Sequence, residues 1–153
     1  MKVEGDPGST YRFKVAGVER SGAISAVRPP EATVVPYDDR ALKYDGDWST
    51  PDAGNRYRGA THRTSDRGAT ATMAARGTSI SLIGDRGPNY GRFEVRVDDG
   101  AWHTVDAQAA DLRVRKVLFA KDGLGGGEHT IRVRNLATDG RPLLAIDAVA
   151  FAR

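Results

Sequence analysis

Alternation of polar and apolar side chains with a period of two residues runs through most of this chain and limits what it can fold into. Phe93, Val95 and Val97 alternate with charged side chains, and an Asp-Asp-Gly turn follows directly at 98–100. A period of two places successive side chains on opposite faces of a strand, and such a turn joins antiparallel strands. Similar strand and turn units recur roughly every 8–12 residues, so we predict an all-β protein, a jelly-roll β-sandwich.

The first 30 residues are predicted to form a separate unit, an N-terminal β-hairpin with a linker. Alternating apolar side chains at 11–15 indicate one strand, and 23–27 indicates a second, shorter strand. The sandwich is assigned to residues 31–153. Because an isolated hairpin is marginally stable in water, its apolar face needs a cover. Either the sandwich or a second copy of the chain provides it, and the second case predicts self-association.

Composition excludes several classes of function. The chain has 153 residues and no cysteine, which rules out disulfides and thiolate metal sites. A net charge of +3, scattered along the chain, does not predict a nucleic-acid binder. No apolar run approaches the ~20 residues that span a bilayer, so we expect no membrane insertion. Residues 1–10 carry no apolar signal-peptide region, and export would therefore be expected as part of a longer protein.

Aromatic residues beside turns are the first candidate ligand-binding residues. Tyr44 and Trp48 flank an Asp-Gly turn, and Tyr90 follows Arg86 and Asn89 in a glycine-rich connection. Sugars stack their C–H faces on aromatic rings and present hydroxyls to nearby polar groups, so these five residues could form a sugar platform. The alternative is that Tyr44 and Trp48 cover the core and that Tyr90 packs on its own loop.

A polar cluster in "YRGATHRTSD", residues 57–66, supplies further candidates. If this segment is one strand, Arg58, His62 and Thr64 share a face. Arg58 and His62 would then act as hydrogen-bond donors to sugar hydroxyls or to a carboxylate. The alternative interpretation is a solvated strand face.

Catalytic and metal motifs are weak. Ser65 and Asp66 lie close to His62, but a hydrolase triad is recognised by geometry and not by proximity along the chain. We therefore expect no enzymatic activity. The three histidines include no pair at i, i+4, which argues against zinc. Asp147 stands within the apolar run "LLAIDAVAF", and a carboxylate there has to be paired, hydrogen-bonded or neutralised.

Several segments carry a resemblance to known modules. They are "YDGDW" (44–48), "YRGATHRTSDRGATATM" (57–73), "GTSISLIGDRGPNYGRFEVRVDDG" (77–100), "RKVLFAKDGL" (115–124), "GEHTIRVR" (127–134) and "LAIDAVAF" (144–151). Through them, residues 37–153 resemble the galactose-binding-like jelly-roll domains, of carbohydrate-binding-module type, found in secreted multidomain bacterial proteins. The segment "YRFKVAGVERSGAISAV" (11–27) resembles the last two strands of a fibronectin type III domain.

The resemblance implies an accessory module that attaches a larger protein to a polysaccharide or cell-surface glycan, outside the cell or at its surface. It implies no cofactor except a structural calcium ion, for which Asp147 occupies the matching position on the last strand. Two other functions stay open at this point. One is a structural, protein–protein interaction module of a surface or phage tail protein, and the other is an unrecognised hydrolase.

Overall fold

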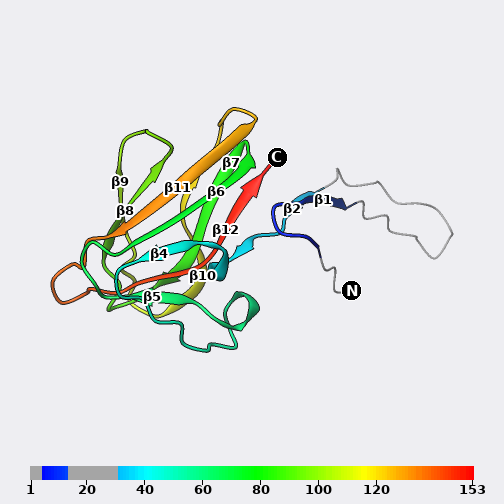
Figure 1. The fold of residues 1–153 in the computed structure, drawn as a ribbon. Helices are drawn as coiled ribbons and strands as arrows, with labels where there is room; N and C mark the ends of the chain where they lie inside the picture. Colours follow the sequence, from blue (N-terminus) through cyan, green and yellow to red (C-terminus); the bar gives the residue numbers. More distant parts are fainter. Residues whose placement is uncertain (1–4, 14–30) are drawn as a thin grey trace, which may run out of the picture.

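The computed structural model describes residues 5–13 and 31–153, which form three antiparallel sheets (Figure 1). The strands are β1 (Thr10–Phe13), β2 (Glu31–Val34), β3 (Tyr37–Asp38), β4 (Lys43–Asp45), β5 (His62–Thr64), β6 (Thr70–Gly77), β7 (Ser79–Arg86), β8 (Arg92–Val97), β9 (His103–Asp106), β10 (Arg113–Lys121), β11 (Gly127–Asn135) and β12 (Leu144–Ala152), with short 3-10 turns η1 (Asp39–Ala41) and η2 (Tyr57–Gly59). No described segment forms a helix long and apolar enough to cross a membrane.

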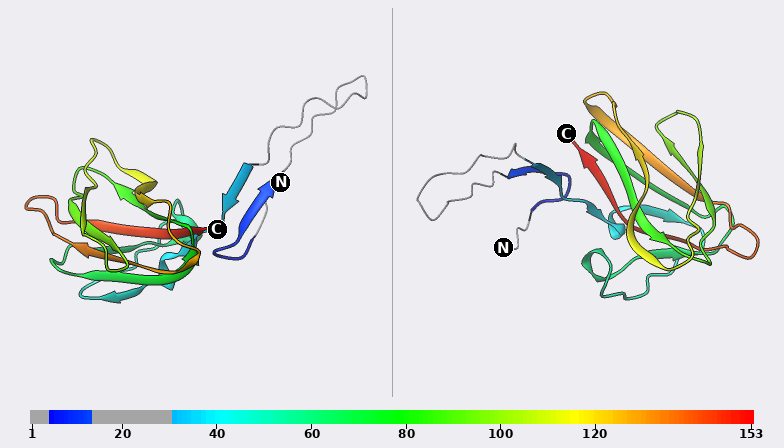
Figure 2. Two further views of the ribbon diagram at one scale, coloured as in Figure 1. Left: turned by 90° about the horizontal axis from the view of Figure 1, so that it is seen from above. Right: turned by 180° about the vertical axis from the view of Figure 1, so that it is seen from behind.

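Two five-stranded sheets make the sandwich. The β7 sheet has the order β10-β7-β12-β3, with β5 also paired to β12, and the β11 sheet has the order β4-β6-β11-β8-β9. Figures 1 and 2 show these two sheets as stacked layers. The predicted all-β sandwich is therefore confirmed, including the hairpin in which β8 and β9 pair across the Asp-Asp-Gly turn.

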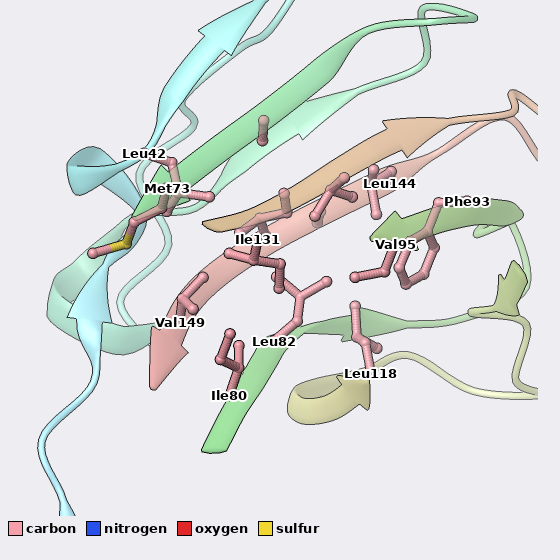
Figure 3. Close-up of a cluster of buried hydrophobic side chains, with 14 of the residues drawn as sticks. Leu42, Met73, Ile80, Leu82, Phe93, Val95, Leu118, Ile131, Leu144 and Val149 are labelled. Atoms are coloured by element: carbon pink, nitrogen blue, oxygen red, sulfur yellow. The ribbon is translucent and has the colours of Figure 1, made fainter. Parts of the chain in front are cut away.

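The core lies between the two sheets and follows the two-residue alternation. Phe93 and Val95 of β8 and Ile131 of β11 point toward Leu82 of β7, and all four are fully buried (Figure 3). Leu144 and Val149 of β12 enter the same cluster from the β7 sheet. Burial of these apolar side chains is the main stabilising contribution in a fold without disulfides.

The described N-terminal residues form a two-stranded sheet outside the sandwich (Figure 2). β1 pairs with β2, whose residues 31–34 the sequence assigned to the sandwich, whereas the expected partner strand at 23–27 lies outside the described residues. Tyr37, next to Gly8, makes an edge-to-face contact with Phe151 at 6.0 Å between ring centroids. The segment before β1 therefore contacts the sandwich. The domain boundary and self-association through the hairpin stay predictions.

Two strands expected from the sequence are broken in the structure. The run at 32–39 divides into β2 and β3, with Pro36 between them. The polar run at 57–66 begins as the turn η2 and becomes a strand only at His62. Arg58 adopts a positive φ of 52° there, so it does not continue a strand toward His62.

The glycine-rich connection between β7 and β8 packs tightly on the connection that precedes β12. Tyr90 forms a bridge with Leu143, and Gly91 N donates to the Leu143 carbonyl oxygen over 3.0 Å. A Cβ atom on Gly91 would collide with the Arg141 carbonyl oxygen and with Thr138. This connection therefore needs glycine for a close backbone approach.

We expect Gly91→Ala to lower the free energy of unfolding by about 1–3 kcal/mol, because the backbone of the neighbouring connection has to move. Chemical denaturation measures the change. Gly54→Ala is the matched control, since no atom lies within 4 Å of the added Cβ, and it should change stability by less than about 0.5 kcal/mol. Equal effects of the two substitutions would contradict this description of the contact.

Candidate functional site

The connection from β4 to β5, residues 46–61, is fastened to the β7 sheet by contacts with buried groups. Arg56 Nη2 donates to Asp85 Oδ2 over 2.7 Å, and the Tyr57 backbone N–H donates to Asp147 Oδ1 over 2.9 Å. The Thr61 hydroxyl donates to the carbonyl oxygen of Ile146 over 2.8 Å. A surface connection held in this way presents its side chains in a fixed arrangement, which lowers the entropic cost of binding.

Three buried carboxylates lie beneath this connection. Asp39 and Asp147 have no exposed surface, and Asp85 is 1% exposed. The pKa of Asp147 is raised to about 6, mainly because the carboxyl group is buried. The hydrogen bond from the Tyr57 N–H lowers this pKa, whereas the nearby charges of Asp85 and Asp39 raise it. Burial also raises the pKa of Asp39. The Oδ1 atoms of Asp39 and Asp85 have no hydrogen-bond partner in the described part of the chain.

Aromatic rings from β4, the following turn and β5 form a stack at the edge of this region. The rings of Tyr44 and His62 are parallel, with 3.9 Å between centroids and 3° between planes. Trp48 packs on Tyr44 at 4.8 Å with a 56° tilt. All three residues are half-buried.

Asp39 fixes the stack from below. Its Oδ2 atom lies 2.7 Å from His62 Nδ1, and its carbonyl oxygen accepts a 2.7 Å hydrogen bond from the Tyr44 hydroxyl. Burial raises the pKa of Tyr44, so this hydroxyl stays protonated as the donor. Trp48 Nε1 donates to the Asp45 carbonyl oxygen over 3.1 Å, which holds the outer ring in place.

The structure brings together some predicted site residues and separates others. Tyr44, Trp48 and His62 meet in the stack, and Tyr44 and Trp48 also pack against the core. Arg58 is exposed in η2, with its guanidinium 5.6 Å from the centre of the adjacent Tyr57 ring. Arg58 and His62 therefore do not share a strand face, because the chain turns between them.

Tyr90 requires a correction. The residue is only 6% exposed, so it does not form the exposed sugar platform that the sequence suggested. Its hydroxyl donates to Asp85 Oδ2 over 3.2 Å, so it contacts one of the three buried carboxylates. Arg86, predicted for the same platform, donates from its guanidinium to the backbone carbonyl oxygen of Asp106. Asn89 is exposed, and its backbone carbonyl oxygen accepts a hydrogen bond from the Leu143 N–H.

Asp147 is the residue at which the resemblance predicts calcium, an ion that takes about 6–8 oxygen ligands. Both Asp147 oxygens lie within hydrogen-bond distance of the Tyr57 N–H, and Arg56 supplies the nearby positive charge. Within residues 5–13 and 31–153, no group of three histidine, aspartate or glutamate side chains is arranged to hold a metal ion. Calcium at Asp147 stays a prediction from the resemblance.

Sequence reasoning missed the residues that organise the region. Asp85 lies at the end of the apolar run of β7, the same signal that singled out Asp147 in β12. Arg56 and Asp39 carried no such signal, because each lies in a polar segment. Their importance follows from contacts across 29 and 23 residues of chain, to Asp85 and His62 respectively.

Sequence comparison connects the chain with carbohydrate-acting proteins. It is 34% identical over 106 residues to an A type blood N-acetyl-alpha-D-galactosamine deacetylase of Flavonifractor plautii, covering 68% of this chain and 14% of that protein. It is 35% identical over 95 residues to an A type blood alpha-D-galactosamine galactosaminidase of the same organism, covering 62% and 9%. The chain thus spans a small part of each curated relative. No family model matches it.

Solved structures share the fold at low sequence identity. A family two carbohydrate esterase from Cellvibrio japonicus aligns with a TM-score of 0.58 at 10% identity, covering 95% of this chain and 35% of that one. The exo-beta-1,3-galactanase from Phanerochaete chrysosporium, solved with galactose, aligns with a TM-score of 0.57 at 17% identity, covering 78% and 30%. Both support the β-sandwich assignment.

The comparisons correct one prediction from the sequence. We expected no enzymatic activity, but both curated relatives are named as enzymes, at 34% and 35% identity over 106 and 95 aligned residues. The aligned part covers only 14% and 9% of their lengths. The chain is therefore similar to a portion of enzymes that act on galactosamine-type sugars.

Proposed function

We propose that this chain is a region of a carbohydrate-active enzyme and that its sandwich binds glycans containing galactose or galactosamine. The relatives' names supply the class of sugar. The observation that carries the proposal is the stack of Trp48, Tyr44 and His62 on a connection fastened to the sheet below. A rigid aromatic group beside exposed polar side chains is the usual construction of a sugar-binding surface.

Trp48 is the ring best placed to meet a sugar. His62 stacks on Tyr44 and Trp48 packs against the same ring, so Trp48 ends the series. Ser49 and Thr50, which follow it, are exposed and carry hydroxyl groups. Arg58, from the same connection, is also exposed. Together these groups offer an apolar face and several hydrogen-bond partners, which matches the two kinds of surface on a sugar ring.

One shallow surface gives modest affinity, since binding has to overcome the lost freedom of the ligand. Attachment to a longer enzyme that contains further binding regions would raise the effective affinity by avidity. This role fits a protein that works outside the cell on a polysaccharide or a cell-surface glycan. We also propose that the N-terminal hairpin derives from the last two strands of a fibronectin type III domain.

We expect Trp48→Ala to weaken binding of a galactan, or of N-acetylgalactosamine, by roughly tenfold, because the end of the stack is lost. Isothermal titration calorimetry measures the affinity, and thermal unfolding confirms that the variant is folded. Trp102→Phe is the matched control, since the Trp102 ring lies against Arg96 and Arg134 of the β11 sheet and is absent from the contacts of the stack. Absence of binding by the unmodified chain, or equal affinity of Trp48→Ala, would overturn the proposal.

A further inference from the structure

A second surface, on the outward face of the β11 sheet, carries a row of positive charge. Lys43 of β4 lies opposite Thr72 of β6, Thr72 lies opposite Arg132 of β11, and Arg132 lies opposite Arg96 of β8. Their inward neighbours along the strands belong to the core, which places all four side chains on the outer side. The row crosses four strands, about 14 Å at ~4.8 Å per strand.

The pairing of Arg132 with Arg96 is unfavourable by itself. Directly opposed residues of an antiparallel pair hold their side chains close together, and like charges there destabilise the sheet. In the described part of the chain, neither arginine makes an ion pair with an acidic side chain, whereas the neighbouring Arg134 pairs with Glu94. The two opposed charges therefore lack compensation from this part of the protein.

Trp102 holds part of this surface rigid. The guanidinium carbons of Arg96 and Arg134 lie 4.8 Å and 4.6 Å from the centre of its ring. Arg96 Nε is buried and has no hydrogen-bond partner among the described residues, so aromatic contact rather than an acceptor positions this group. A guanidinium fixed in this way loses little conformational freedom when an anion binds.

We propose that this face binds an acidic polysaccharide through the carboxylates of its uronic acid residues. A carboxylate between Arg132 and Arg96 relieves their repulsion and accepts charge-assisted hydrogen bonds, which are among the stronger polar contacts. The hydroxyls of Thr72 and Thr130, on the same face, suit the hydroxyls of a sugar chain. This site is separate from the aromatic stack around Trp48 and does not depend on it.

Several observations favour a glycan over nucleic acid. The row contains three cations interrupted by a threonine, whereas sustained phosphate binding uses more closely repeated positive charge. Glu94 and Glu128 also point outward from this face, which would repel a continuous phosphate backbone. A polysaccharide whose carboxylates are widely spaced can place them near the arginines and is repelled less by Glu94 and Glu128.

The test measures binding of the full chain to polygalacturonate by calorimetry, with neutral galactan and a DNA duplex as comparisons. We expect binding to polygalacturonate that weakens as salt rises. Arg132→Gln should weaken it roughly tenfold while raising the melting temperature, because the like-charge pair is removed. Arg113→Gln is the matched control for binding, since it removes the same charge from the exposed surface of β10 on the other sheet. Because Arg113 lies opposite Arg86, the melting temperature of Arg132→Gln is compared with that of the unmodified chain alone.

Three results would overturn the proposal. They are no binding to polygalacturonate at low salt, equal losses in Arg132→Gln and Arg113→Gln, and binding to the DNA duplex as tight as to polygalacturonate. Trp48→Ala separates this site from the proposed galactoside site. It should leave polygalacturonate binding unchanged, so failure of one site is distinguishable from failure of the other.

Discussion

Replacing Arg56 by methionine is expected to lower the free energy of unfolding by about 3–5 kcal/mol, the largest effect foreseen for one substitution outside the core. The Arg56 side chain is 9% exposed and that of Asp85 is 1% exposed, so their ion pair is shielded from water. Methionine fills a similar volume but leaves Asp85 charged and buried. Urea denaturation followed by circular dichroism measures the loss.

A double substitution identifies the cause. Asp85→Asn in the Arg56→Met background removes the uncompensated charge, and the asparagine oxygen can still accept the hydrogen bond from Tyr90. Most of the lost stability should return. A loss below about 1 kcal/mol in the single variant would show that Asp85 is solvated or neutralised in another way.

Asp147→Asn is expected to stabilise the protein by about 3 kcal/mol at neutral pH. The folded protein holds the pKa of Asp147 at about 6, against an ordinary value of 3.8 for aspartate. Below the lower value the carboxyl is protonated in both states and contributes no penalty. As pH rises toward 6, the unfolded state ionises first, so the stability of the folded state falls. Above 6 the full cost of a buried charge is present, and asparagine avoids it.

The measurement is the difference in unfolding free energy between the two proteins at several pH values. It should be small near pH 4 and grow until about pH 6–7, in favour of the variant. Asp139→Asn is the control, because Asp139 is fully exposed and should show no such trend. Parallel stability curves for the unmodified protein and Asp147→Asn would mean that Asp147 is ionised without cost.

The sequence predicted the sandwich well because the alternation is a local signal with a direct structural meaning. Phe93 and Val95 are separated by one charged residue, and the strand geometry alone places both in the core. The apolar run at 143–151 likewise indicated a strand, and the structure forms β12 there, paired with β7, β3 and β5. Neither inference required contacts between distant segments.

The candidate site was less predictable because it depends on such contacts. The burial of Tyr90 follows from its bridge to Leu143 and its hydrogen bond to Asp85, which no local pattern reveals. Arg58 was placed on a strand face, but the turn η2 is fixed by the distant carboxylate of Asp147. Local alternation therefore predicted which residues are strands and not where a turn interrupts them.

The proximity of Tyr44 and Trp48 was predictable, since only a short turn separates them. Their association with His62 was not, because it arises from the pairing of β5 with β12 and of β4 with β6. Asp39 then links Tyr44 and His62 by two hydrogen bonds. The organisation of the stack is thus a property of the fold as a whole.

An NMR titration of the chain with N-acetylgalactosamine and with a galactan oligosaccharide tests glycan binding at the aromatic stack most directly. The indole N–H signals of Trp48 and Trp102, assigned with Trp102→Phe, report on the two faces independently. We predict saturable shifts of the Trp48 indole and of backbone amides between residues 46 and 62, with the Trp102 indole unchanged. Saturable shifts confined to other parts of the sandwich, or no shifts with either sugar, would contradict the account.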